Sequence, residues 1–141
     1  MDPEGGAEAV AGLPVLVQQV GTFWDARQRP NVHLFHYSDL RADLVGQMRR
    51  LAEILRVDEP GDELVDAATF TSMKRRADEL VPNSDTPFWR SNDRFFDQGR
   101  TGAWRAFLDG DGLRRYDETL ARFAPPDLAR YVNEGWGAAN E

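Results

Sequence analysis

Apolar side chains recur at helical spacing near the start of the chain. The repeat begins at Leu13 and stops before Pro30, in the segment RQRPN. Proline cannot continue a helix, so the pattern predicts a helix that ends ahead of it. The apolar positions of this predicted helix are Leu16, Val20, Phe23 and Trp24.

The next segment, VHLFHY at residues 32–37, has the character of a strand. It is short, rich in apolar and aromatic residues, and flanked by Pro-Asn and Ser-Asp. Ser38 or Asp39 can then cap a helix over residues 40–55. This order predicts one clear buried strand and an amphipathic helix, which together make half of a βαβ unit. The apolar stripe of that helix comprises Leu40, Leu44, Met48, Leu51 and Leu55.

The remaining pattern is helical on both sides of a long interruption. Short helices are predicted at residues 64–68 and 71–80, and two more at 113–123 and 126–132. Residues 81–102 lack periodicity but contain four aromatic side chains, which favours a functional loop over a disordered one. A mostly α-helical chain with one buried strand needs strand partners. The pattern therefore indicates a fragment of a parallel sheet, or pairing with another chain.

Composition narrows the class of protein. The chain has 141 residues, the size of one domain, and its formal charge is −7. This balance argues against nucleic-acid binding, which needs a basic face. The absence of cysteine excludes disulfides and thiolate metal sites.

The sequence gives no indication of a membrane segment. Its apolar runs fall short of the ~18 residues of a membrane helix, and the first residues do not have the pattern of a signal peptide. We expect a soluble, cytoplasmic protein. Residues 1–12 are predicted to be a flexible lead, residues 13–135 one domain, and residues 136–141 a tail.

The segment RFFDQGRTGAW, residues 94–104, is the clearest candidate site. Gly99 and Gly102 enclose Arg100 and Thr101. Successive backbone N–H groups, a guanidinium and a hydroxyl can surround a phosphate or sulfate. A plain turn is the alternative interpretation, and the pattern by itself favours it.

Other clusters are interpreted as structural. His33 and His36 face opposite sides of the predicted strand and cannot chelate one metal together. DGDG at residues 109–112 lacks the later ligands of a calcium loop and is predicted to cap the helix near Leu113. The basic residues 74–76 are predicted to form a solvated helix face. No metal site is predicted, and no catalytic residue can be named.

Three segments, taken in order, resemble the C-terminal half of PAPS-dependent sulfotransferases. They are NVHLFHYSDLRADLVGQMRRLAEIL, LVDAATFTSMKRRAD and RFFDQGRTGAWRAFL, and the resemblance runs from about Val20 to about Val132. It implies a P-loop-like α/β fold around a parallel sheet, with residues 13–135 as the C-terminal portion of a sulfotransferase domain. It also implies transfer of a sulfuryl group from 3'-phosphoadenosine 5'-phosphosulfate (PAPS) to a hydroxyl or amine. In such chemistry, positioning and charge neutralisation supply most of the catalysis.

The resemblance implies nucleotide-binding roles for individual residues. Tyr37 matches the tyrosine of the family's Tyr-x-Asp-Leu segment. Phe70 and Met73 match the family's phenylalanine and methionine on the adenine side, with Thr69 in place of a serine. Gly99 matches the glycine of the Arg-Lys-Gly segment, which holds the 3'-phosphate of PAPS or of the product adenosine 3',5'-bisphosphate.

Two positive charges of that phosphate site are replaced in this chain. Asp97 and Gln98 stand where the family has arginine and lysine, so the resemblance places an acid and an amide beside the 3'-phosphate. Our hypothesis is that Arg100, one position past the glycine, restores a positive charge. Gly102 and Trp104 match the glycine and tryptophan that follow in the family.

Two functional parts of the family have no counterpart in these residues. One is the 5'-phosphosulfate segment of the type Pro-Lys-x-Gly-Thr, and the other is the region with the catalytic histidine. We therefore expect a chain that supplies the adenine and 3'-phosphate side and is inactive alone. Its partners would be the nucleotide, an acceptor that the sequence does not identify, and a complementary N-terminal half or another chain. The alternative is a non-catalytic helical interaction or regulatory domain derived from the same scaffold.

Overall fold

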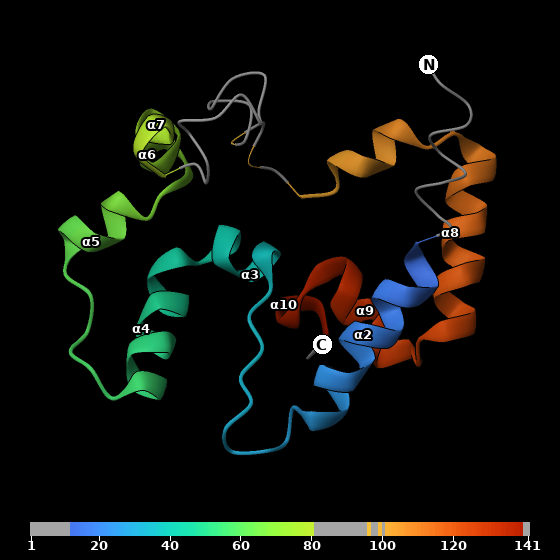
Figure 1. Cartoon of the computed structure of the whole chain (residues 1–141), viewed down its shortest axis with the longest axis horizontal. Coiled ribbons are helices and arrows are strands. Elements are labelled where there is room, and N and C mark those ends of the chain that lie inside the picture. The colour runs from blue at the N-terminus through green and yellow to red at the C-terminus, as the bar shows by residue number, and fades with distance from the viewer. Residues whose placement is uncertain (1–11, 81–95, 97–98, 100, 140–141) are drawn as a thin grey trace. The chain divides into compact units, whose positions relative to one another are not determined.

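The computed structural model describes residues 12–80, 96, 99 and 101–139. Every regular element in these ranges is a helix (Figure 1). The helices predicted from periodicity at the two ends of the chain and at residues 64–68 are confirmed, whereas the helix predicted at residues 71–80 is divided at Arg76. The elements are α2 (Leu13–Ala26), α3 (Tyr37–Ala42), α4 (Leu44–Leu55), α5 (Asp62–Ala67), α6 (Phe70–Arg75), α7 (Ala77–Leu80), the 3-10 helix η2 (Ala103–Phe107), α8 (Gly110–Phe123), α9 (Pro126–Glu134) and α10 (Trp136–Ala139).

The prediction of a buried strand at residues 32–37 is wrong. Residues 32–36 have no regular structure, and Tyr37 already begins α3. A strand needs a second strand to satisfy its backbone, and none exists among the described residues. A side chain satisfies one backbone group of this segment instead, since Trp136 Nε1 donates to the backbone carbonyl of Leu34 at 3.3 Å.

His36 fixes the end of this segment. Its Nδ1 accepts from the backbone N–H of Ser38 at 3.1 Å, so the ring hydrogen is on Nε2. Nε2 in turn lies 3.3 Å from the carbonyl oxygen of Val132, to which it donates. The ring also contacts Tyr131 edge-on, at 5.3 Å between centroids. His36 therefore has a structural role, as its place in the sequence predicted.

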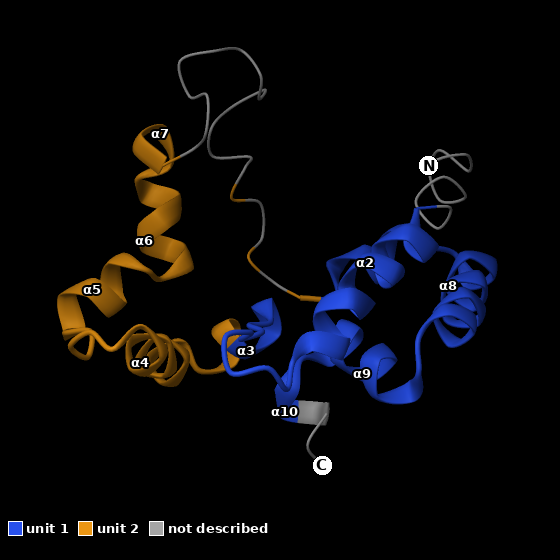
Figure 2. Cartoon of the chain, turned by 60° about the horizontal axis from the view of Figure 1, so that its bottom comes forward, with its two compact units in different colours: residues 1–39, 102–141 blue, residues 40–101 orange. Residues whose placement is uncertain are grey.

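The chain divides into two compact units (Figure 2). Unit 1 comprises residues 1–39 and 102–141, and unit 2 comprises residues 40–101. Unit 2 is thus an insertion in the sequence of unit 1. Each unit has its own packing and is described by itself.

The core of unit 1 forms where α2 packs along α8 and against the C-terminal helices (Figure 1). Trp24 is 3% exposed and lies at its centre, stacked on Trp136 at 5.3 Å and tilted against Tyr131 at 4.8 Å. Aromatic side chains bury large areas, and each pair adds about 0.5–1.5 kcal/mol beyond its burial. The buried core residues are Leu13, Val17, Trp24, Leu120, Ala124, Leu128 and Tyr131.

The helix α2 has apolar side chains on two sides. Leu13, Val17 and Trp24 are buried against the core, whereas Leu16 and Phe23 are 54% and 52% exposed. Leu16 and Phe23 therefore do not belong to the buried face, although the apolar pattern of the sequence groups them with Trp24. The buried face follows a step of four residues from Leu13 to Val17 and a step of seven from Val17 to Trp24. Because α2 is apolar on both sides, its sequence alone does not show which of its apolar residues form the buried face.

The predicted helix over residues 40–55 is divided into α3 and α4. Asp43 lies between them with φ −145° and ψ 78°, and its carboxylate accepts from the backbone N–H of Gly46 at 2.9 Å. Asp43 is therefore the N-cap of α4, in place of Ser38 or Asp39. The carboxylate of Asp39 instead accepts from backbone N–H groups of α10.

The helices α8 and α9 of unit 1 begin where the sequence predicted their caps. Asp109 Oδ1 accepts from the backbone N–H of Gly112 at 2.8 Å and begins α8, which confirms the capping interpretation of DGDG. Pro126 occupies the first turn of α9, and Gly135 ends that helix with φ +86°. None of the described helices has the length and hydropathy needed to cross a bilayer.

Candidate functional site

The turn between α5 and α6 positions the first predicted site residues. Thr69 caps α6, because its hydroxyl oxygen accepts from the backbone N–H of Ser72 at 3.2 Å while the hydroxyl donates to the carbonyl of Asp66 at 2.8 Å. Phe70 then begins α6 and Met73 follows one turn later, both half-buried. Three-residue spacing places these two apolar side chains on the same side of the helix.

Gly99 packs directly on the ring of Phe70. A Cβ at Gly99 would lie 2.6 Å from two ring carbons of Phe70, which is closer than real Cβ atoms approach. Gly99 also has φ +59°, a conformation that favours glycine. Phe96 contacts the same ring edge-on at 6.1 Å. The structure thus brings together two of the predicted nucleotide-binding residues from separate sequence motifs.

A positive charge lies beside the same ring. The ammonium of Lys74 is 5.9 Å from the ring centroid of Phe70. The two basic residues that follow have other contacts: Arg75 Nη2 donates to Ser72 Oγ at 3.1 Å, and Arg76 Nε pairs with Glu79 at 2.9 Å. Ser72 itself is 5% exposed. The prediction of a plain solvated face therefore does not describe Lys74, which contacts an aromatic ring.

The other predicted residues have different surroundings. Tyr37 is the first residue of α3, belongs to unit 1 and is 48% exposed, whereas Phe70, Met73 and Gly99 belong to unit 2. Arg100 lies outside the described residues, as do Asp97 and Gln98, so its role as a compensating charge stays a prediction.

The second glycine of the candidate loop begins a separate aromatic contact in unit 1. Gly102 has φ +72° and precedes η2, in which Trp104 packs on Tyr116 of α8 at 4.3 Å between ring centroids. The hydroxyl of Tyr116 donates to Asn133 Oδ1 at 2.8 Å, and burial raises the pKa of Tyr116. Trp104 therefore attaches the end of the loop to α8 and α9, a contact that the sequence pattern did not reveal.

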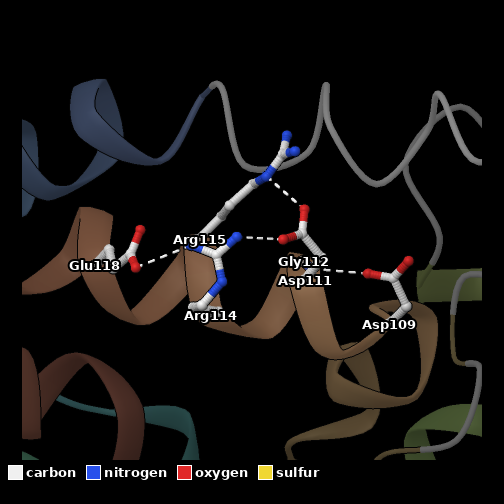
Figure 3. Close-up of polar contacts among 6 residues, drawn as sticks. All are labelled: Asp109, Asp111, Gly112, Arg114, Arg115 and Glu118. Carbon is white, nitrogen blue, oxygen red and sulfur yellow. Dashed lines mark hydrogen bonds and ion pairs between the residues drawn. The ribbon is translucent and has the colours of Figure 1, made fainter.

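The first turns of α8 display a network of ion pairs, shown in Figure 3. Asp111 accepts from Arg114 and pairs with Arg115 Nε at 2.7 Å, and Arg114 Nη1 reaches Glu118 at 3.0 Å. The hydrogen bond from Arg114 lowers the pKa of Asp111. All members are exposed, so this network stabilises the helix modestly.

A shallow groove of about 560 Å³ lies on unit 2, and the residues that line it precede Phe70 in the sequence. Arg49 in its wall pairs with Glu59 at 3.2 Å, so that charge is matched within the groove. Within the described ranges, no group of three or more His, Cys, Asp or Glu side chains is arranged to hold a metal ion. The groove is lined by Gly46, Arg49, Arg50, Glu53, Val57 and Glu59.

Comparison with known proteins shows to which protein family the chain belongs. Residues 14–125 match the family model of the sulfotransferase domain, which is most of the chain. The chain therefore belongs to the sulfotransferase domain family, as the three motifs indicated.

Curated relatives agree with this assignment. A glycolipid sulfotransferase of Mycobacterium bovis is 38% identical over 131 residues, and one of Mycobacterium tuberculosis is 37% identical over the same length. The match covers 91% of this chain and 40% of each relative, so the chain spans less than half of the relatives' length. No solved structure matches the chain.

Proposed function

We propose that this chain supplies the adenine and 3'-phosphate side of a sulfotransferase that uses PAPS as its donor. The observation that supports this role most directly is the packing of Gly99 on Phe70, which joins the two motifs assigned to those parts of the nucleotide. Family membership makes a sulfuryl donor the expected ligand. The proposal concerns binding and orientation, and no described residue is assigned to catalysis.

The residues of the site suit these tasks. Phe70 and Met73 present apolar surface from one side of α6, against which an adenine ring can lie. Gly99 lacks a side chain and has a left-handed backbone, so a phosphate can approach its N–H group closely. When bound, PAPS supplies a sulfur whose bond to the 5'-phosphate oxygen breaks as the acceptor oxygen bonds to it. This chain would hold the leaving nucleotide in place during that exchange.

For the acceptor, we propose a hydroxyl group of a glycolipid. The support is the name of the two mycobacterial relatives, which are glycolipid sulfotransferases at 38% and 37% identity. The acceptor loses its proton to a base as the sulfur–oxygen bond forms. We propose that this base lies outside the present residues and that the isolated chain does not catalyse transfer.

Binding of adenosine 3',5'-bisphosphate tests the donor assignment. We expect the product nucleotide to raise the thermal unfolding temperature of the chain, since a ligand bound by the native state stabilises it. Phe70→Ala should weaken binding measured by calorimetry by about fivefold to a hundredfold, since stacking on an aromatic is worth about 1–3 kcal/mol. Phe107→Ala is the control, because Phe107 is 77% exposed and belongs to unit 1. No stabilisation of the wild-type chain at millimolar nucleotide would overturn the proposal.

A second role, assembly with a complementary portion of a sulfotransferase domain, is favoured by the outer face of α2. Val15, Leu16 and Phe23 are 69%, 54% and 52% exposed on this helix. A helix that is apolar on both sides is normally covered on both sides. Since the chain covers 40% of its relatives, we propose that the occupant of this face is the remaining part of such a domain.

Mixing the chain with the unmatched portion of a mycobacterial relative tests this assembly. We expect a one-to-one complex in sedimentation experiments, abolished by Leu16→Asp with Phe23→Asp and retained by the control Gln18→Asp on the same helix. A complex that forms without any nucleotide binding would favour the non-catalytic interaction domain. Self-association of the chain through this face would contradict the proposed occupant, and isotopic sulfuryl transfer by the chain alone would contradict its inactivity.

A further inference from the structure

The ring of Phe70 is contacted by three groups of unit 2. The backbone of Gly99 lies on it so closely that a Cβ there would be 2.6 Å away. Phe96 contacts its edge. The ammonium of Lys74 lies 5.9 Å from its centroid, which is within the range of a cation–π contact. The ring of Phe70 is therefore in contact both with a positive charge and with the glycine that is assigned to the 3'-phosphate.

The spacing along α6 explains this placement. Phe70 and Lys74 are four positions apart, and such side chains are neighbours on a helix surface. Phe70 begins the helix because Thr69 caps it, so the cap also fixes where Lys74 emerges. A lysine has a flexible stem and a compact charge, which lets its ammonium reach a phosphate from the side of an aromatic ring.

Lys74 offers the site a positive charge in addition to the one that we hypothesise for Arg100. At positions 97 and 98 the sequence has an acid and an amide, where sulfotransferases of this type have arginine and lysine. A phosphate held by backbone N–H groups alone forfeits the stronger, charge-assisted hydrogen bonds. Arg75 and Arg76 contact Ser72 and Glu79, whereas Lys74 contacts the Phe70 ring.

We propose that Lys74 is a phosphate-binding residue of the nucleotide site and supplies, from helix α6, positive charge for the 3'-phosphate. This inference rests on the proposed function, because it assigns one phosphate of the same ligand. The positive charge of Lys74 would come from α6, the helix that also contains the adenine-side residues Phe70 and Met73. Lys74 is thereby a determinant of selectivity between nucleotides with and without a 3'-phosphate.

Comparing two nucleotides separates this role from general binding. Adenosine 3',5'-bisphosphate has the 3'-phosphate and adenosine 5'-monophosphate lacks it. We expect Lys74→Gln to weaken the bisphosphate by about tenfold and the monophosphate by less than about twofold, as one charge-assisted hydrogen bond is lost. Lys74→Arg should retain most of the preference, since the charge is kept. Raising the salt concentration should reduce the preference for the bisphosphate over the monophosphate more in the wild-type chain than in Lys74→Gln.

Arg76→Gln is the matched control, because Arg76 is on the neighbouring turn and pairs with Glu79. It should leave both affinities unchanged. Equal losses for the two nucleotides in Lys74→Gln, or no loss for either, would overturn the role of Lys74 while leaving nucleotide binding intact. A wild-type chain that binds neither nucleotide would overturn the proposed function as well. Circular dichroism of each variant checks that α6 and its neighbours remain folded.

Discussion

The carboxylate of Asp39 accepts the backbone N–H of Trp136, with distances of 3.1 and 3.0 Å to its two oxygens. Oδ1 also accepts from the backbone N–H of Gly137 at 3.2 Å, and Asp39 is 8% exposed. The preceding Gly135 has φ +86°, and a Cβ there would lie 2.6 Å from the same oxygen. One buried acid thus ties the end of the central segment to the C-terminal helix.

Removing this acid should destabilise unit 1. Asp39→Ala leaves the part-buried backbone N–H groups of Trp136 and Gly137 without their acceptor, and we expect a loss of about 1–3 kcal/mol in the free energy of unfolding. Asp117→Ala, at an exposed position on α8, should change it by less than about 0.5 kcal/mol. Urea denaturation measures both. Equal effects of the two substitutions would show that the Asp39 hydrogen bonds are of no consequence for stability.

Truncation should destabilise the chain far more at Trp24 than at the adjacent Phe23 of α2. Trp24→Ala opens a cavity in the core and loses the hydrogen bond from Trp24 Nε1 to Asp127, 3.1 Å long, so a cost of about 3–5 kcal/mol is expected. Phe23→Ala removes a side chain that is 52% exposed and should cost less than about 1 kcal/mol in the isolated chain. Thermal and urea unfolding report the difference. A larger effect at Phe23 would mean that the buried face of α2 is wrongly assigned.

Adding a methyl group at Gly99 should displace the ring of Phe70. The left-handed backbone alone makes Gly99→Ala unfavourable by about 1–2 kcal/mol, and the contact with Phe70 adds to this. Gly110→Ala is the control, because nothing lies within 4 Å of a Cβ there. The double variant with Phe70→Ala should recover part of the loss, as a double-mutant cycle would reveal. Strict additivity would contradict contact between the two residues.

The ion pairs of Asp111 should make α8 sensitive to acid. Hydrogen bonding from Arg114 lowers the pKa of Asp111 in the folded chain from its ordinary value of 3.8. The resulting stabilisation is complete above the unfolded pKa and is lost as the pH falls through the lower, folded value. Asp111→Asn should therefore destabilise the chain at neutral pH, and the difference from wild type should shrink on acidification. Asp117→Asn, outside the network, should show no such convergence in unfolding measured against pH.

Periodicity predicted most of the helical segments, because the apolar spacing and the caps that define a helix are both local in the sequence. Asp109 caps α8, Pro125 caps α9, and Pro126 is the first residue of α9, so both starts can be recognised from neighbouring residues in the sequence. The strand at 32–37 was predicted wrongly because its composition says nothing about a partner. In the structure the carbonyl of Leu34 accepts from Trp136, and the ring of His36 donates to the carbonyl of Val132, so both partners come from a distant part of the chain.

The candidate site was predicted in part. The sequence resemblance assigned Phe70 and Gly99 to different parts of one nucleotide, and the structure places the two residues in contact. The position of Lys74 depends on where α6 begins, which is set by the Thr69 cap, so residue type alone suggested a solvated face. Asp39 was assigned to a local cap because the groups that it binds are 97 and 98 positions away. Tyr37, in the other unit, remains a prediction from the resemblance.

The insertion of unit 2 into unit 1 has a consequence for the order of folding. Unit 2 is continuous in sequence, whereas the core of unit 1 requires α2 to meet helices made near the end of the chain. Closing so long a loop costs entropy before its contacts repay it, and contacts between distant residues slow folding. During synthesis, all of unit 2 is made before α8–α10, so Trp24 and its apolar neighbours are still without the helices that bury them. This interval is when the nascent chain would most need a chaperone.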